Sequence, residues 1–341
     1  MAGRRLQLAR SLMAVGAHRF LGRRAPASLL VVNYHRIHAR AGLGPTRFDD
    51  GVFDTDVATF RRQMQWLKAA TVVLDEDQLL RLDQGGELPR DTVYSAVTFD
   101  DGYVDCFDLA RPVLDDLGIR GMFFIPFDML EQRRLGWWDV SAYLLKSTTR
   151  RSIQVDEQDY DLEGDFAGSL RRVLDVFKLQ PAEHTEALLA RLADACGVAV
   201  PSRDLQSAEL MSWQQVRAMR AAGHGIGSHT ISHRVLATLS PQAQADEIKG
   251  SKRSLETILG HEVSSFAYPV GGPQHINEHS VRLAREAGYQ QAFTFLTGLA
   301  SLPLADRFTI PRESAVSLQV LKAKALLPRV MGLQVAHTAN G

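Results

Sequence analysis

The sequence lacks most of the features that would assign it to a specialised class of protein. It contains two cysteines, Cys106 and Cys196, so we expect neither a disulfide framework nor a cysteine-based zinc site. Its 39 basic and 39 acidic residues balance, so no surplus of positive charge points to nucleic acid as a partner. No stretch is apolar over the length needed to span a bilayer. The remaining composition, 45% hydrophobic and 23% charged residues, is that of an ordinary globular protein.

The beginning of the chain is basic. Residues 1–24 contain six arginines and no acidic residue, and their apolar segment is too short for a clear secretory signal peptide. We predict a basic amphipathic helix and tail over residues 1–27, which either binds an anionic membrane surface weakly or packs on the domain. A second basic amphipathic helix and tail is expected over residues 315–341. We therefore expect a cytoplasmic protein whose ends can contact the inner membrane peripherally; its oligomeric state is not indicated.

Between these ends, short apolar runs rich in β-formers alternate with segments of helical periodicity. The alternation lapses between about residues 135 and 210, where helical spacing dominates, and we interpret this part as a helical insertion. About seven strand–helix units predict an α/β barrel or a barrel-like fold for residues 28–314. The runs expected to form strands are 29–34, 71–74, 96–99, 121–126, 225–228, 265–268, 291–295 and 307–310.

Two adjacent acidic residues follow one of these runs. Residues 96–102 read Ala-Val-Thr-Phe-Asp-Asp-Gly, which is typical of a buried strand that ends in a turn. Ligands bind at the carboxyl ends of the strands in α/β sheets, so Asp100 and Asp101 are well placed for chemistry. Two neighbouring carboxylates repel each other, and a metal cation would keep both ionised. Taken alone, the sequence Asp-Asp-Gly at residues 100–102 also fits a solvated turn.

A pair of histidines lies at the corresponding end of another expected strand. Residues 229–233 read His-Thr-Ile-Ser-His, and on a helical turn residues four apart share one face, so both imidazoles could approach one ion. His229 and His233 with Asp101 supply the nitrogen and oxygen donors that zinc accepts. Cobalt, nickel or manganese are alternatives. Asp100 could then act as a general base, and a backbone N–H at residues 268–271 could stabilise an oxyanion. Each stretch by itself also fits a purely structural role.

Residues 98–102, 229–233 and 266–271 resemble, in order and spacing, the first three motifs of the polysaccharide deacetylases, the NodB-homology or carbohydrate esterase 4 family. The resemblance runs from about residue 29 to residue 312. It implies a distorted (β/α)7 barrel and a metal-dependent hydrolysis of the N-acetyl group of a hexosamine. It also implies that Asp100 is the base, that Asp101, His229 and His233 are the metal ligands, and that the oxyanion and substrate residues are Tyr268, Pro269, Val270 and Gly271.

The sequence departs from the family pattern at several positions. Ala267 stands where the third motif usually has an arginine, and Val270 stands where it usually has a tyrosine. Arg312, at the end of the last expected strand, is the candidate replacement for the missing arginine. The downstream motif with the catalytic acid is absent, but Tyr34-His35 resembles the permuted members that deacetylate poly-N-acetylglucosamine. His35 is therefore the candidate acid, since protonating a leaving amine needs a group that titrates near neutrality; the alternative is a buried histidine that stabilises a loop.

The sequence predicts a metal-dependent deacetylase that acts on an N-acetylated polysaccharide, oligosaccharide or lipid-linked glycan. Trp138 is expected to line the sugar-binding cleft, with core packing as the alternative. One alternative function is a deformylase or another amidase with the same site. A catalytically inactive glycan-binding protein is a further alternative, suggested by the altered third motif and opposed by the intact acidic pair and histidine pair.

Overall fold

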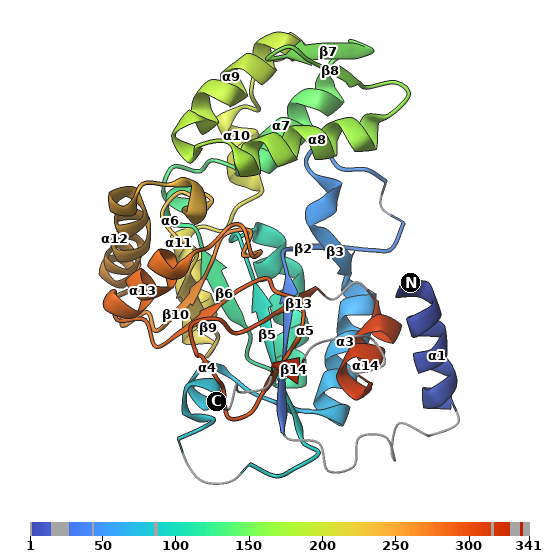
Figure 1. The fold of residues 1–341 in the computed structure, drawn as a ribbon, viewed down its shortest axis with the longest axis vertical. Coiled ribbons are helices and arrows are strands. Elements are labelled where there is room, and N and C mark those ends of the chain that lie inside the picture. Colours follow the sequence, from blue (N-terminus) through green and yellow to red (C-terminus); the bar gives the residue numbers. More distant parts are fainter. Residues whose placement is uncertain are drawn as a thin grey trace.

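The computed structural model describes residues 2–14, 27–42, 44–84, 88–314, 317–327 and 335–336. Its centre is a curled sheet of mostly parallel strands, a half-barrel (Figure 1). The strands are β1 (Ser28–Tyr34), β4 (Val72–Val73), β5 (Val93–Phe99), β6 (Met122–Ile125), β9 (Gly225–Ser228), β10 (Ser265–Ala267), β11 (Gln291–Phe293), β12 (Leu299–Ser301), β13 (Glu313–Ser314) and β14 (Val335–Ala336). Their order is β11-β10-β9-β6-β5-β1-β12-β14, with β13 on β1 and β4 on β5. The predicted barrel-like α/β fold is confirmed.

The two long central strands fix the position of the site. β1 and β5 pair in parallel from Ser28↔Val93 to Tyr34↔Phe99, so the residues that follow, His35 and Asp100, emerge side by side. Successive side chains of β1 alternate between two hydrophobic clusters on opposite faces of the sheet. Both faces are therefore covered, which is why this strand reads as a continuous apolar run in the sequence.

Helices surround the sheet, with α12 and α13 on one side of it and α3 with α14 on the other (Figure 1). The helices of this layer are α3 (Val57–Ala70), α4 (Glu76–Arg81), α5 (Arg111–Leu117), α6 (Phe127–Glu131), α11 (Trp213–Ala221), α12 (Pro241–Leu259), α13 (Glu278–Glu286) and α14 (Leu318–Leu326). A π-helical turn, Cys106–Ala110, runs into α5. A small two-stranded sheet, β2 (Arg36–His38) with β3 (Phe53–Asp56), extends the end of β1.

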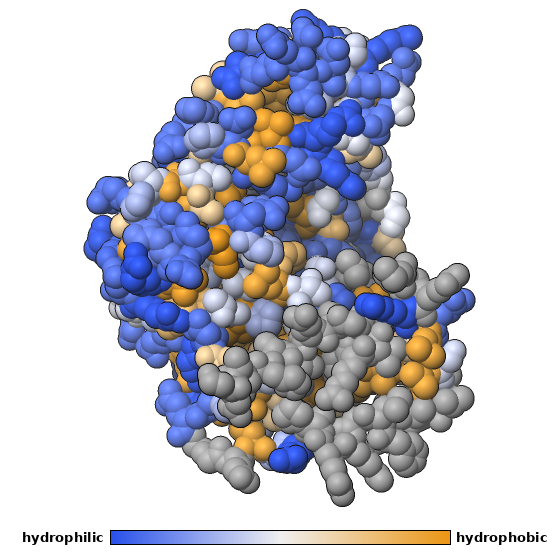
Figure 2. Space-filling view, in the orientation of Figure 1, coloured by the Kyte–Doolittle hydropathy of each residue, from blue (hydrophilic) through white to orange (hydrophobic). Residues whose placement is uncertain are grey.

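The insertion forms a lobe beyond the carboxyl ends of the strands (Figure 1). It contains helices α7 (Trp137–Ser147), α8 (Phe166–Leu179), α9 (Thr185–Cys196) and α10 (Arg203–Ala208). The insertion was expected to be helical, and beside these helices it contains an antiparallel hairpin formed by β7 (Ser152–Val155) and β8 (Gln158–Asp161). Its two-residue turn has positive φ at Asp156 and Glu157 without the glycine that usually signals such a turn. The visible surface of the lobe is mostly hydrophilic, with one apolar patch (Figure 2).

Each end of the chain was expected to form a helix and a tail. Helix α1 (Ala2–Ala14) packs its apolar side on α14, and the contact involves Leu6, Ala9, Leu12, Met13, Ala323, Leu326 and Leu327. Residues 15–26 lie outside the described part of the chain, so the rest of the expected N-terminal helix does too. Within the C-terminal helix and tail expected over residues 315–341, α14 ends at Leu326, and residues 335–336 form a strand. The strand expected at residues 307–310 is reduced to a single bridge between Phe293 and Ile310. Within the described ranges, no helix combines the length and apolarity that a membrane crossing needs.

Candidate metal and catalytic site

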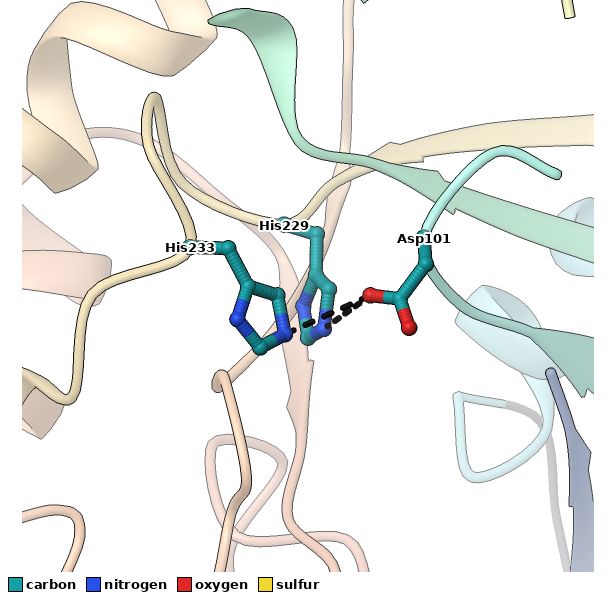
Figure 3. Close-up of side chains that lie close together, drawn as sticks. All are labelled: Asp101, His229 and His233. Carbon is teal, nitrogen blue, oxygen red and sulfur yellow. Dashed lines mark ion pairs between the residues drawn. The ribbon is translucent and has the colours of Figure 1, made fainter. Parts of the chain in front are cut away.

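Three of the predicted residues converge at the carboxyl edge of the sheet. Asp101 follows β5, and His229 and His233 follow β9; one ligand atom from each lies within 4.8 Å of the others. The Nε2 atoms of His229 and His233 lie 3.7 and 3.3 Å from Asp101 Oδ1. Figure 3 shows both imidazole rings directed at this carboxylate. All three side chains are buried. The fold therefore brings together the three residues that the sequence analysis grouped as metal ligands.

The backbone that carries the two histidines differs from the predicted helical turn. Residues 229–233 form an irregular loop in which Thr230 and His233 have φ of 66° and 53°. His229 Nδ1 lies 2.7 Å from the carbonyl oxygen of Ala267. Because a carbonyl oxygen only accepts, Nδ1 carries the proton and the Nε2 lone pair faces Asp101. The loop thus presents the ring nitrogen that a metal would bind.

The electrostatics of this cluster suit a cation. Burial lowers the pKa of His229 to about 4 and the pKa of His233 well below its usual range, so both rings are neutral. Burial, with the charges of Asp100 and Asp139, raises the pKa of Asp101 to about 7 against the opposing charges of His35 and Arg312. Asp101 Oδ1 and His233 Nδ1 lack hydrogen-bond partners among the described groups. Two neutral imidazoles and one carboxylate form a donor set that fits zinc and similar divalent ions.

Asp100 is held by an arginine from the far end of the domain. Arg312 Nη1 and Nη2 lie 2.8 and 2.9 Å from Asp100 Oδ1 and Oδ2, and Asn33 Nδ2 donates to Oδ2 over 3.1 Å. Burial alone would raise the pKa of Asp100, but the charge of Arg312 outweighs it and holds that pKa well below its usual range. Asp100 is therefore an ionised proton acceptor at neutral pH. Arg312, the candidate replacement for the arginine that the third motif lacks at Ala267, contacts Asp100 directly.

His35 lies on the other side of Asp100. Its Nε2 is 4.0 Å from Asp100 Oδ2, and its Nδ1 is 3.4 Å from Asp54 Oδ2 in β3. Burial lowers the pKa of His35, but the hydrogen bond and charge of Asp54, with the charges of Asp101 and Asp100, raise it to about 9. His35 is therefore protonated at neutral pH. Asp54 was not predicted, because it belongs to no motif and its position depends on the pairing of β2 with β3.

One pocket of about 230 Å³ between the barrel and the lobe is lined by His35, Asp100, Asp101, His229, His233 and Arg312. Trp138, from the lobe, forms part of its wall, and its ring lies 4.4 Å from the His233 ring. Trp138 Nε1 donates to the Tyr103 hydroxyl over 2.7 Å, which in turn donates to Asp139 over 2.7 Å. The remaining lining residues beyond those described above are Asp49, Val52, Trp137, Leu174, Lys178, Val270 and Phe295.

The third motif contributes less to the pocket than expected. Tyr268 is buried and donates its hydroxyl to the carbonyl of Phe308 over 3.1 Å, so it supports the barrel and does not line the pocket. Of residues 268–271, Val270 lines the pocket, and its backbone has φ of 59°. Gly271, with φ of 63°, leaves room for the backbone N–H of Phe295, which a Cβ at Gly271 would approach to 2.6 Å. Tight packing at Gly271 therefore shapes this turn.

Parts of the chain are similar to known proteins. A family model described as polysaccharide deacetylase matches residues 159–292. The "Putative polysaccharide deacetylase YxkH" of Bacillus subtilis (strain 168) is 35% identical over 88 residues, which are 26% of this chain. The match spans only 30% of that relative's length.

Solved structures share the fold. The Streptococcus pyogenes deacetylase PplD in complex with acetate matches with a TM-score of 0.57 at 18% identity, over 88% of this chain and 99% of that one. A polysaccharide deacetylase from Bacillus cereus matches with a TM-score of 0.52 at 18% identity, over 87% and 68%. IcaB from Ammonifex degensii matches with a TM-score of 0.50 at 18% identity, over 85% and 92%. The chain thus contains a region, residues 159–292, that matches the polysaccharide deacetylase family model, and it shares the fold of these solved deacetylases.

Proposed function

We propose that this protein is a metal-dependent hydrolase that removes the N-acetyl group from an N-acetylhexosamine unit of a polysaccharide, an oligosaccharide or a lipid-linked glycan. The observation that carries the proposal is the juxtaposition, in one pocket, of a three-ligand donor set, the ionised carboxylate of Asp100 and the protonated imidazole of His35. The acetate named with the Streptococcus pyogenes deacetylase is the product that such a reaction releases.

Asp101, His229 and His233 would hold the divalent ion. Zinc is the first candidate because two imidazoles and a carboxylate are a common catalytic zinc set, and cobalt, nickel or manganese are alternatives. When bound, such an ion lowers the pKa of a water molecule and polarises the acetyl carbonyl. Asp101 Oδ1 would gain the partner that it lacks among the described groups.

Asp100 is the proposed general base. Its Oδ2 lies 4.0 Å from His35 Nε2 and 3.9 Å from His229 Nε2, so it faces the centre of the pocket. The ion pair with Arg312 keeps it ionised and fixes its orientation, while Oδ1, which accepts from Arg312 alone among the described groups, retains a further lone pair. Asp100 would take the proton of the attacking water as the new carbon–oxygen bond forms.

His35 is the proposed general acid. Because Asp54 accepts on the Nδ1 side, the protonated Nε2 faces Asp100 and the reacting centre. As the carbon–nitrogen bond of the amide breaks, His35 would give its proton to the leaving amine, and acetate remains as the second product. The water proton on Asp100 and the proton given by His35 balance the reaction.

The pocket wall would orient the substrate. The backbone N–H of Val270 makes no hydrogen bond within the described part of the chain, so it is the candidate donor to the developing oxyanion. Trp138, Leu174 and Phe295 offer apolar surface for a sugar face and the acetyl methyl group.

The location is a separate part of the proposal. We propose a cytoplasmic enzyme that contacts the inner membrane peripherally through its basic ends. Since the apolar side of α1 is occupied by α14, such contact would depend on charge, and co-sedimentation with anionic vesicles should disappear at high salt. Absence of binding at low salt would contradict it.

The function is tested by acetate release from N-acetylglucosamine oligomers. We expect the purified chain to lose activity on chelation, to regain it with zinc or cobalt, and to lose it permanently in His229→Ala. Formate release from N-formylated sugars, without acetate release, would instead favour the deformylase alternative. Metal binding without any hydrolysis would favour a glycan-binding protein.

A further inference from the structure

The loop of residues 229–233, which carries the two histidines, donates three hydrogen bonds to one carboxylate. Glu247, on α12, is buried, and its Oε2 accepts the backbone N–H groups of Ile231 and Ser232, each over 2.9 Å. Its Oε1 accepts the hydroxyl of Ser232. The middle of the loop between His229 and His233 is thus bound to one side chain of a neighbouring helix.

The same face of α12 supports the loop at two more points. Gly250 lies one turn after Glu247, and a Cβ there would come within 2.7 Å of Ile231 Cδ1, so its lack of a side chain allows close packing. Ser228 Oγ, just before His229, donates to Ser251 Oγ over 2.8 Å. Residues three and four apart share a helix face, so Glu247, Gly250 and Ser251 form one continuous support.

The two histidines differ in how their rings are oriented. His229 has a partner for its second ring nitrogen, the carbonyl of Ala267, as metal-binding histidines usually do. His233 Nδ1 has none among the described groups. The direction of the His233 ring therefore depends on its backbone, whose N–H donates to Thr230 Oγ1 over 3.0 Å, and on packing against Trp138. Left-handed φ values at Thr230 and His233 persist only where the surroundings impose them.

We propose that Glu247 is a positioning residue of the metal site, which fixes the loop so that His233 presents Nε2 to the ion. This inference rests on the proposed function, because it presumes that the loop holds a metal. An ionised carboxylate can accept from two N–H groups and one hydroxyl at once, and no neutral side chain of similar size matches it. Glutamine keeps one accepting oxygen, so it should replace Glu247 in part.

The test is metal affinity of the full chain, measured by competition with a zinc chelator. We expect Glu247→Ala to weaken zinc binding by about 10–100-fold, the usual effect of losing such support, and Glu247→Gln to weaken it less. Asp246→Ala is the matched control, because Asp246 is an exposed carboxylate on the same helix. The visible spectrum of the cobalt-loaded protein should change in Glu247→Ala and stay the same in Asp246→Ala.

A merely structural role for Glu247 would lower thermal stability without changing zinc affinity or the cobalt spectrum. Hydrogen exchange of metal-free protein adds a second measurement, in which the amides of Ile231 and Ser232 lose protection in Glu247→Gln. If Glu247→Ala does not fold, Glu247→Gln and Ser232→Ala, which removes one of the three bonds, take its place. Unchanged affinity in folded variants of a zinc-binding protein overturns the positioning role alone. A wild type that binds no zinc overturns the proposed function, and this inference with it.

Discussion

Arg312 and Asp100 are 212 positions apart in the chain, yet their side chains form a two-point ion pair in the floor of the pocket. Arg312 Nη1 also donates to Asn33 Oδ1 over 2.7 Å, and Nε donates to the Thr294 carbonyl over 3.0 Å. The guanidinium therefore links β1, the end of β5 and the end of β11 at the proposed base. Both its charge and its planar shape are used.

The first prediction concerns this pair. Arg312→Met leaves a buried carboxylate without its cation, which costs about 3–5 kcal/mol of folding free energy and raises the pKa of Asp100. Arg312→Lys keeps the charge but loses the two-point geometry, so we expect acetate release to fall by about 10²-fold with a smaller loss of stability. Urea unfolding and turnover measured on the same samples check this. Wild-type turnover in Arg312→Lys would show that the orientation of Asp100 does not matter.

A second prediction concerns the pH dependence of the proposed acid. With its pKa raised to about 9, His35 is protonated below that pH, so kcat/KM should fall as pH rises through this region. Asp54→Asn removes the hydrogen bond and charge that raise the pKa, and the basic limb should move down by about 1–3 pH units. Asp56→Asn is the control: Asp56 lies on the same strand and caps α3, where asparagine is an equally good cap. A basic limb that stays in place in Asp54→Asn excludes His35 as the acid.

A third prediction concerns acid stability away from the site. His224 is fully buried and accepts the Gly121 N–H at Nδ1 over 3.2 Å, and burial lowers its pKa to about 4. The unfolded chain binds the proton near pH 6.5, so the stabilising effect of the neutral ring is present above that pH and is lost as pH falls towards 4. The difference amounts to about 3 kcal/mol.

His224→Asn keeps an acceptor for Gly121 and removes the titrating group. Its free energy of unfolding should fall less steeply than that of the wild type between pH 6.5 and pH 4, as followed by urea titration at several pH values. Parallel pH dependences of the two proteins would rule out His224 as a source of acid sensitivity.

A fourth prediction assigns a binding role to the insertion. Leu174 and Lys178 on α8 line the pocket, and Phe177 fixes the helix by stacking on Trp137 at 5.2 Å. Leu174→Ala removes apolar contact surface, so KM for N-acetylglucosamine oligomers should rise by up to about tenfold with little change in kcat. Leu179→Ala, on the exposed side of the same helix, should leave both constants unchanged. Equal KM values in both variants would mean that α8 does not touch the substrate.

The sequence predicted those parts of the site that depend on local pattern. Asp100, Asp101 and His229 follow buried strands, and the parallel pairing of those strands brings their ends to one edge. His35 follows from the same rule, since its strand pairs with that of Asp100. Position at a strand end was therefore enough to group side chains that are far apart in sequence.

The remainder depends on tertiary packing that leaves no local signal. The helical turn predicted for residues 229–233 is an irregular loop. Three hydrogen bonds to Glu247 on α12 take the place of the backbone hydrogen bonds of a helical turn. Asp54 reaches His35 only through the pairing of β2 and β3. The hairpin in the insertion was missed because Asp156 and Glu157 adopt positive φ without glycine.

The central claim is that one ion is held by Asp101 and the two histidines while Asp100 moves the proton. It is tested most directly by metal content and acetate release measured together in wild type, Asp100→Asn and His229→Ala. We predict about one metal per chain and turnover in the wild type, loss of both in His229→Ala, and retained metal with turnover reduced by about 10²–10⁴-fold in Asp100→Asn. Wild-type turnover in Asp100→Asn, or a wild type that hydrolyses the substrate with no metal after exhaustive chelation, would contradict the account.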